Sequence, residues 1–425
     1  MVSIIVTVTF IVLMFLRCPV TFSMGLAALL GVVLLDANIV IIPQYIAGGT
    51  QSFALLAVPF FLLAGNLMNS LGLTKRIFGL AQTIVGHIKG GLAQVNVVAS
   101  IIFAGISGAA LADAAGLGVV EVTAMTKAGY RKSFATAVTL ASASIGPIIP
   151  PSIVMVIYGI QAEVSIGKLL VAGILPGLVI GGSLMLMNYY LAARGIETCP
   201  VTPRQPLGKV AKSFGQNILA VLAPVFIVGG LITGIVTPTE AGIVAVVFSI
   251  LVGFIYKEIS FKEMRNALME TVKSTSIIMI LIGVSSVISW IYTYERLPQI
   301  AAITILSLSQ NKYIILLLVN IFLLFMGCLI EPIPLLLIAT PILVPLMQQI
   351  GVDLVHFGVI ICYNITLGMI TPPMGVGLYV MMKVVDISFE ELVKAVLPFL
   401  IPLIGTLLLV TFFPAISLAL VNLFW

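Results

Sequence analysis

Two long apolar segments of the chain are each interrupted by a glycine followed by a pair of prolines. The first interruption reads Gly-Pro-Ile-Ile-Pro-Pro at 146–151, and the second reads Gly-Met-Ile-Thr-Pro-Pro at 368–373. A proline inside a helix removes a backbone hydrogen bond and clashes with the preceding turn, so both helices are expected to break here. Broken backbone at membrane depth is tolerated only where it is buried in protein or lines a cavity. Matching breaks in two halves of one chain therefore point to a transporter binding site near the middle of the bilayer.

The composition places these segments in a membrane. Of the 425 residues, 61% are hydrophobic and only 8% are charged, whereas a soluble domain carries about 25% charged residues. We therefore predict an all-α polytopic membrane protein. Its basic residues are dispersed and do not interleave with aromatic residues, which argues against nucleic-acid binding. The four cysteines have no metal-ligand spacing and the two histidines lie far apart, so neither a disulfide framework nor a metal centre of these residues is expected.

The first half, 1–194, contains a polar arm at 72–90 and then two short apolar segments joined by small residues. Each segment is shorter than the roughly 20 residues of a full helical crossing. This pattern predicts a re-entrant helical hairpin near 91–128, followed by a broken helix over 134–160.

The second half, 215–425, repeats this order after a polar, proline-containing linker at 195–214 that we expect in the cytoplasm. It contains a second hairpin near 312–350 and a second broken helix over 355–384. Glycines support the repeat, because three of them recur at one constant offset: Gly105, Gly129 and Gly146 correspond to Gly327, Gly351 and Gly368.

Loop charge predicts how the two halves are oriented. Cytoplasmic loops of membrane proteins are enriched in lysine and arginine. If the first arm is cytoplasmic and both hairpins re-enter, all but Lys168, Arg296 and Lys312 of the 20 basic residues lie inside. The first hairpin then enters from the cytoplasm and the second from outside, which is an inverted-topology repeat. Both termini are expected outside.

The hairpin tips and the broken helices carry the polar groups suited to a small cation. Asp113 and Glu331 are carboxylates at the two tips, where helix ends expose unpaired backbone groups. Together with hydroxyl and carbonyl oxygens they predict two hard-oxygen sites. The first would combine Ser107, Gly108 and Asp113 with Ser144, Gly146 and Ile149, and the second Gly327 and Glu331 with Thr366, Gly368, Thr371 and Met374.

An anionic substrate would have to bind without an arginine, because none is expected at membrane depth. Backbone N–H groups at helix starts, hydroxyls, amides and bound cations are the alternatives. The substrate-binding candidates are Asn66, Ser107, Ser152, Asn364 and the proline pairs Pro150, Pro151, Pro372 and Pro373.

Structural roles compete with these assignments. Asp113 and Glu331 are also suited to cap the helices that follow them, and Glu121 is expected to pair with Lys127 or to extend to the membrane surface. An ion channel also uses broken helices. An intramembrane enzyme would need a convergent nucleophile and base, which the sequence does not offer.

Three motifs, in order along the chain, resemble one known family. They are the first hairpin tip from Gly105, the first break through Ser152, and Thr-Pro-Pro-Met-Gly-Val-Gly-Leu-Tyr at 371–379. The chain resembles the large membrane subunit of tripartite ATP-independent periplasmic (TRAP) transporters over essentially its whole length. One departure is Ala-Ala-Leu at 109–111, where family members often carry serine or valine.

The resemblance implies a bacterial inner-membrane protein that imports a carboxylate, either a C4-dicarboxylate or a sialic acid-like sugar acid, with sodium ions. It also implies a periplasmic substrate-binding protein and a small four-helix membrane subunit, expected as a separate chain. A carboxylate transporter that works without a soluble receptor remains the alternative. In an elevator-type transporter of this kind both hairpins and broken helices move as one body, with the substrate between the hairpin tips. The implied sodium ligands are Ser107, Gly108, Asp113 and Gly146, and Gly327, Glu331, Thr366 and Thr371.

Overall fold

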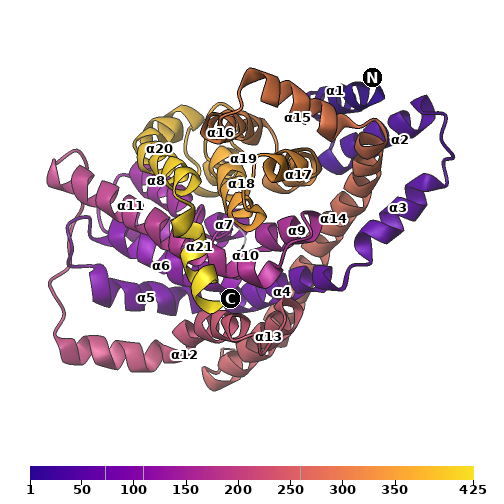
Figure 1. Ribbon diagram of the computed structural model, residues 1–425. Helices are drawn as coiled ribbons and strands as arrows, with labels where there is room; N and C mark the ends of the chain where they lie inside the picture. The colour runs from indigo at the N-terminus through magenta and orange to yellow at the C-terminus, as the bar shows by residue number, and fades with distance from the viewer. Residues whose placement is uncertain (72, 109, 259) are drawn as a thin grey trace.

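Figure 1 shows the computed structural model, which describes residues 1–71, 73–108, 110–258 and 260–425. Every regular element in this described part is a helix. Seven of these helices are long and apolar enough to cross a membrane. This confirms the predicted all-α polytopic membrane protein.

In its described residues, the first half contains eleven α-helices and one 3₁₀ helix, labelled in chain order. They are α1 (Val2–Phe15), α2 (Val20–Leu34), α3 (Ile41–Thr50), η1 (Phe53–Leu56), α4 (Ala57–Ser70), α5 (Leu73–Val85), α6 (Leu92–Ser107), α7 (Ala110–Lys127), α8 (Lys132–Ala143), α9 (Ile153–Gln161), α10 (Ile166–Ala172) and α11 (Ile174–Ala193).

The second half continues from the linker to the end of the chain. Its helices are α12 (Leu207–Ile232), α13 (Pro238–Ile255), α14 (Phe261–Tyr294), α15 (Leu297–Leu308), α16 (Lys312–Leu329), α17 (Pro332–Gln349), α18 (Leu354–Gly368), α19 (Val376–Val385), α20 (Phe389–Phe412) and α21 (Pro414–Phe424).

Two helices begin with a polar stretch ahead of their apolar span, and the first of them starts earlier than the sequence predicts. Helix α12 begins at Leu207, inside the predicted linker 195–214, directly after Pro206. Helix α14 begins at Phe261 because the Ser260 side chain accepts a hydrogen bond from the Glu263 N–H, 3.2 Å away. A polar first stretch thus extends an apolar span on its N-terminal side.

Both proline pairs lie where the chain leaves the α-helical conformation. Helix α8 ends at Ala143 and α9 begins at Ile153, while α18 ends at Gly368 and α19 begins at Val376. The peptide bonds Pro150-Pro151 and Pro372-Pro373 are both cis. The Ser152 side chain caps α9 by accepting a hydrogen bond from the Met155 N–H, so the helix restarts directly after the first pair.

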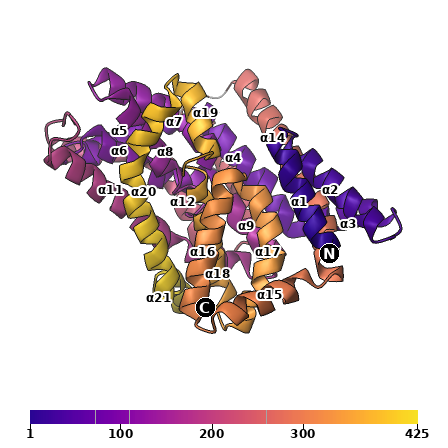
Figure 2. The same ribbon diagram turned by 90° about the horizontal axis from the view of Figure 1, so that it is seen from above.

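Helices α6–α9 and α16–α19 form a central group, and the remaining long helices flank it. Helices α6, α7 and α8 pack together, α16 and α17 pack on α18, and α9 packs on both α17 and α18. Long helix α14 packs on α2, α3 and α4 along one flank, as Figure 2 shows. The two halves therefore meet both along α14 and where α9 contacts α17 and α18.

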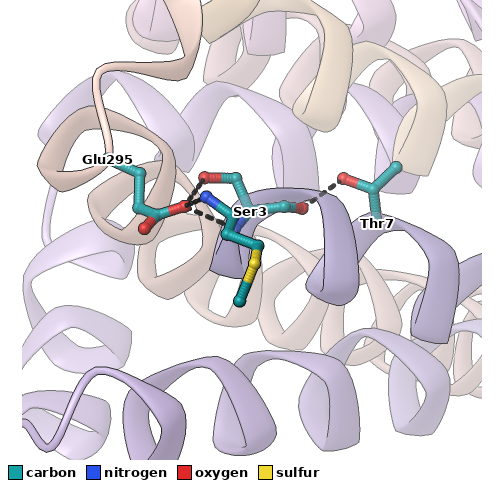
Figure 3. Close-up of polar contacts among 4 residues, drawn as sticks. Ser3, Thr7 and Glu295 are labelled. Atoms are coloured by element: carbon teal, nitrogen blue, oxygen red, sulfur yellow. Dashed lines mark hydrogen bonds and ion pairs between the residues drawn. The ribbon is translucent and has the colours of Figure 1, made fainter.

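The start of α1 is held against the end of α14 by Glu295 (Figure 3). Its Oε2 atom accepts hydrogen bonds from the Met1 ammonium at 2.7 Å and from the N–H and Oγ of Ser3, both at 2.9 Å. The bond from the ammonium, followed by those from Ser3, lowers the pKa of the Glu295 carboxyl to about 2. This junction fixes two flanking helices that are distant in the sequence.

Candidate functional site: a cavity between two helix turns

A cavity of about 270 Å³ lies where the turn between α6 and α7 faces the turn between α16 and α17. These turns, residues next to the two breaks and α14 line the cavity. The turns and breaks contribute Gly108, Ala110, Pro147, Glu331, Pro332, Thr366 and Met369, and α14 contributes Ser274, Ile277, Ile278 and Leu281. The structure thus brings together Gly108, Glu331 and Thr366 from the sequence-predicted set.

The first turn lies against the first break because residue 108 is glycine. Gly108 adopts a left-handed conformation with φ of 65°, which side chains other than glycine rarely adopt. A Cβ atom there would collide with the Pro151 carbonyl oxygen and would lie 3.2 Å from the Ser152 Cα. The absence of a side chain therefore allows the backbone of the α6–α7 turn to approach the break.

The second turn makes a similar approach to the second break. A Cβ atom on Gly368 would lie 2.5 Å from both the Cα and the carbonyl carbon of Gly327. Real Cβ atoms essentially never come this close to backbone, so position 368 requires glycine, and a Cβ atom on Gly327 would lie only 3.1 Å from the Gly368 Cα. In each half of the chain, glycine allows a helix turn to touch a break through backbone alone.

Three predicted hydroxyls have their hydrogens directed back to their own helices. Ser144 Oγ donates to the Ala141 carbonyl at 2.6 Å, Thr366 Oγ1 to the Cys362 carbonyl at 2.7 Å, and Thr371 Oγ1 to the Leu367 carbonyl at 2.8 Å. A hydroxyl that donates its only hydrogen in this way keeps its lone pairs as acceptors. These oxygens therefore have the chemistry of ligands for a hard cation.

Glu331 precedes α17 at the N-cap position, but its side chain does not cap the helix. In contrast, the Asp353 carboxylate accepts hydrogen bonds from the Val355 and His356 N–H groups at the start of α18. Among the described residues, no hydrogen-bond donor or cation contacts the Glu331 carboxylate, which borders the cavity. The capping alternative for Glu331 is therefore wrong in this structure.

Other predicted site residues are engaged in helix packing. Asn66 Nδ2 donates to Thr271 Oγ1 at 2.9 Å, and Asn364 Nδ2 donates to Asn320 Oδ1 at 2.7 Å. The Ser152 hydroxyl donates to the Pro147 carbonyl while capping α9. None of these three predicted substrate-binding side chains lines the cavity.

The two breaks differ in exposure. The predicted residues Gly146, Ile149, Pro150 and Pro151 are buried, whereas Pro372 is half-buried and Pro373 and Met374 are exposed. The second break thus reaches the molecular surface. Ser107 ends α6 and Asp113 lies in the first turns of α7, but their side chains lie outside the part of the chain that the structure describes.

The sequence did not predict a buried polar network between α6, α7 and α8. Asn96 Nδ2 donates to Glu121 Oε2 at 2.8 Å and to Thr139 Oγ1 at 2.7 Å, and Ser142 Oγ donates to Asn96 Oδ1 at 2.7 Å. Glu121 is only 1% exposed, so the expectation that it extends to the membrane surface is wrong. Ser100 Oγ also donates to Ser142 Oγ at 2.9 Å. The signal in the sequence was the spacing of Asn96 and Ser100, four positions apart in an apolar helix.

Known proteins resemble the chain over almost its full length. The family model described as "Tripartite ATP-independent periplasmic transporter, DctM component" matches residues 7–416. The sialic acid TRAP transporter large permease protein SiaM of Vibrio cholerae is 43% identical over 415 residues, covering 97% of this chain and 96% of that protein. The C4-dicarboxylate TRAP transporter large permease protein DctM of Pseudomonas aeruginosa is 37% identical, covering 88% and 87%.

Two solved structures share the arrangement of helices. The YdaH transporter of Alcanivorax borkumensis has a TM-score of 0.65 at 14% identity, with 86% of each chain covered. MtrF of Neisseria gonorrhoeae has a TM-score of 0.58 at 15% identity, with 89% of this chain and 85% of that chain covered. At these identities the likeness concerns the fold alone.

Proposed function

Because the chain belongs to the family of large membrane components of tripartite ATP-independent periplasmic transporters, we propose that it imports a carboxylate driven by a sodium gradient. The observation that carries this proposal is the cavity between the two helix turns, with the Glu331 carboxylate and the Thr366 residue at its border. Membership of the family makes it a multi-pass membrane transporter and not an enzyme.

Sodium ions enter the proposal as co-transported substrate. The Glu331 carboxylate, which has no polar partner among the described residues, and the hydroxyls of Thr366 and Thr371 would supply oxygen ligands on the second half, and Ser144 would supply one on the first. Bound cations offset the large cost of moving a carboxylate through a medium of low dielectric constant. A membrane potential adds about 2.3 kcal/mol for each net charge per ~100 mV, which gives the transport its direction.

The two halves act as an inverted-topology repeat in this proposal. The bounds of α7 (Ala110–Lys127) and α17 (Pro332–Gln349) are related by the same offset that relates Gly146 to Gly368. Helices α6–α7 and α16–α17 would be the re-entrant hairpins, and α8–α9 and α18–α19 the broken helices. These elements would move together, elevator-like, against the flanking helices, with both chain termini on the periplasmic side of the inner membrane.

A sialic acid-like sugar acid is the substrate class that we propose first. The relative named for sialic acid is 43% identical over 97% of this chain, and the one named for C4-dicarboxylate is 37% identical over 88%. The large permease protein YiaN of Escherichia coli, named for the sugar acid 2,3-diketo-L-gulonate, is 36% identical. Competition for uptake between sialic acid and succinate distinguishes the two classes.

Two protein partners complete the proposed transporter. A periplasmic substrate-binding protein would deliver the carboxylate, and a small four-helix membrane subunit would pack against the flanking helices. This part of the proposal is supported by the family to which the chain belongs.

Uptake into proteoliposomes tests the proposal directly. Carboxylate accumulation should require both an inward sodium gradient and the soluble binding protein, and Asp113→Ala should abolish it while the complex still assembles. Ohmic current with sodium would indicate a channel instead. Full uptake without the soluble protein would support the receptor-independent alternative. Normal uptake by Asp113→Ala would show that Asp113 only caps a helix.

A further inference from the structure

The segment that joins α11 to α12 is attached to the base of the α6–α7 hairpin through Tyr130. The Tyr130 hydroxyl accepts a hydrogen bond from the Leu92 N–H at 2.8 Å. It lies 2.8 Å from the Pro200 carbonyl oxygen and 3.1 Å from that of Gly90, to either of which it donates. Tyr130 is only 3% exposed and its ring stacks on Phe134. One phenol thus ties the linker to the start of α6.

Two glycines, Gly86 and Gly91, allow the linker to lie close to the base of the α6–α7 hairpin. The Thr202 N–H donates to the Gly86 carbonyl at 3.1 Å, and a Cβ atom on Gly86 would lie 2.7 Å from Thr202 Oγ1. A Cβ atom on Gly91 would collide with the Pro200 carbonyl oxygen. The backbone of the linker and that of the hairpin base are therefore in direct contact.

An ion pair adds a third attachment. Glu197 of the linker is 8% exposed and pairs with Arg131, the residue before α8. Burial raises the pKa of the Glu197 carboxyl, and the Arg131 charge opposes this rise. A nearly buried carboxylate is costly without its cation, so this pair favours the attached linker.

These attachments end at Thr202. In the segment 203–206, the side-chain hydrogen bond runs from Gln205 Nε2 to the Pro203 carbonyl at 3.3 Å, within the segment itself. Fully extended, residues 203–206 reach about 14 Å, whereas the unattached linker 195–206 would reach about 40 Å. The attachments therefore convert a long connection into a short one.

We propose that Tyr130 is a positioning residue that makes the linker travel with the α6–α7 hairpin, so that residues 203–206 take up the motion relative to α12. This inference rests on the proposed transport function, in which the hairpins move against the flanking helices. A shorter free segment restricts the relative positions of the two bodies, and freeing 195–202 would reduce the fraction of molecules in the productive arrangement by up to about fivefold.

Thiol labelling of Cys199 in the purified transporter tests the attachment without any transport. Cys199 is half-buried, and burial raises its thiol pKa to about 11, so its labelling should be slow with or without sodium. Tyr130→Phe keeps the stacked ring and should speed labelling about tenfold by removing the hydroxyl bonds. Tyr292→Phe, which removes a buried hydroxyl bonded to Thr7, is the matched control and should leave labelling unchanged.

Cross-linking then tests the role in transport. The variant Arg131→Cys/Glu197→Cys, with the native cysteines replaced by serine, should keep its sodium-dependent uptake after the two thiols are joined by a bifunctional thiol reagent. Tyr130→Phe should lower Vmax up to about fivefold without changing KM, and the cross-linked cysteine pair should restore Vmax in that variant. A merely structural role for Tyr130 would not be rescued by a cross-link at residues 131 and 197.

Two results would overturn the inference. Fast labelling of Cys199 in the unaltered protein would show a free linker, and loss of uptake on cross-linking residues 131 and 197 would show that the linker must detach. If the variants have no sodium-dependent uptake at all before cross-linking, the proposed function fails, and the Cys199 labelling of Tyr130→Phe alone decides whether the linker is attached.

Discussion

Gly327 and Gly368 touch through their backbones, since a Cβ atom on Gly368 would lie 2.5 Å from the Gly327 Cα. This contact joins the end of α16 to the end of α18, beside the cavity that Glu331 and Thr366 border. Gly108 makes the corresponding approach to Pro151 in the first half. The positions of the two helix turns therefore depend on glycines that bring backbone to backbone.

Replacing Gly368 by alanine should separate this contact. Overpacking of a tight site costs about 1–3 kcal/mol, so Gly368→Ala should lower the melting temperature and strongly reduce sodium-dependent uptake. Gly405→Ala is the control, because a Cβ atom on Gly405 meets nothing within 4 Å. Wild-type uptake by Gly368→Ala would show that the close approach is not needed.

Removing the charge of Glu331 should weaken sodium binding and leave the fold intact. The carboxylate makes no hydrogen bond or ion pair with the described residues, so Glu331→Gln breaks none with them. We expect the sodium concentration for half-maximal uptake to rise at least about tenfold, as for loss of a charged ligand. Glu240→Gln, at an exposed capping box, should not change it. An unaltered sodium dependence in Glu331→Gln would show that Glu331 does not bind sodium.

The Thr366 hydroxyl offers a finer test, because valine has nearly the same shape as threonine. Thr366→Val should raise the half-maximal sodium concentration by about tenfold through the loss of one oxygen ligand, and Thr371→Val should act in the same direction. Thr366→Ser keeps the hydroxyl and should restore the sodium dependence. Equal behaviour of Thr366→Val and Thr366→Ser would indicate a packing role only.

The junction at Glu295 should make stability depend on acidity. Its pKa is lowered from 4.5 to about 2 by the bonds from Met1 and Ser3, so the charged form is favoured in the folded state. The stabilisation is complete above about pH 4.5 and is lost as the pH falls towards 2. In detergent, the difference in melting temperature between the unaltered protein and Glu295→Gln should shrink over this range. A melting-temperature difference that stays constant over this pH range would contradict the stabilising role of the charged Glu295 carboxylate.

The opposite orientation of the halves can be tested at two exposed lysines. Lys89 precedes α6 and Lys312 begins α16, so an inverted repeat places them on opposite sides of the membrane. In a cysteine-free background, an impermeant thiol reagent added outside whole cells should label Lys312→Cys and not Lys89→Cys. Labelling of both variants from one side would contradict the inverted repeat and the transport mechanism proposed from it.

Much of the helix order follows from hydropathy and proline placement. The expected broken helices at 134–160 and 355–384 correspond to α8–α9 and α18–α19, because glycine and proline act locally on the backbone. Helix ends were less predictable. Helix α12 starts inside the expected linker, directly after Pro206, and α14 starts after the Ser260 cap; both features act at single residues that a hydropathy window averages out.

Polar partners were the least predictable part of the site. Asn66, Ser152 and Asn364 looked available for substrate, but each makes a hydrogen bond within the helix packing. Glu121 looked peripheral and is buried beside Asn96. In a membrane, the cost of an unpaired polar group drives such side chains to partners that are distant in sequence.

The amino-acid order by itself determined that this chain is helical, crosses a membrane several times and breaks at two proline pairs, because hydropathy and backbone restriction act over short distances. Tertiary structure alone decided which oxygens border the cavity, which glycines carry a backbone contact and where the linker is attached. Those features arise between residues far apart in the chain, such as Gly327 with Gly368 and Tyr130 with Pro200. Packing sets such distances, and no local pattern encodes them.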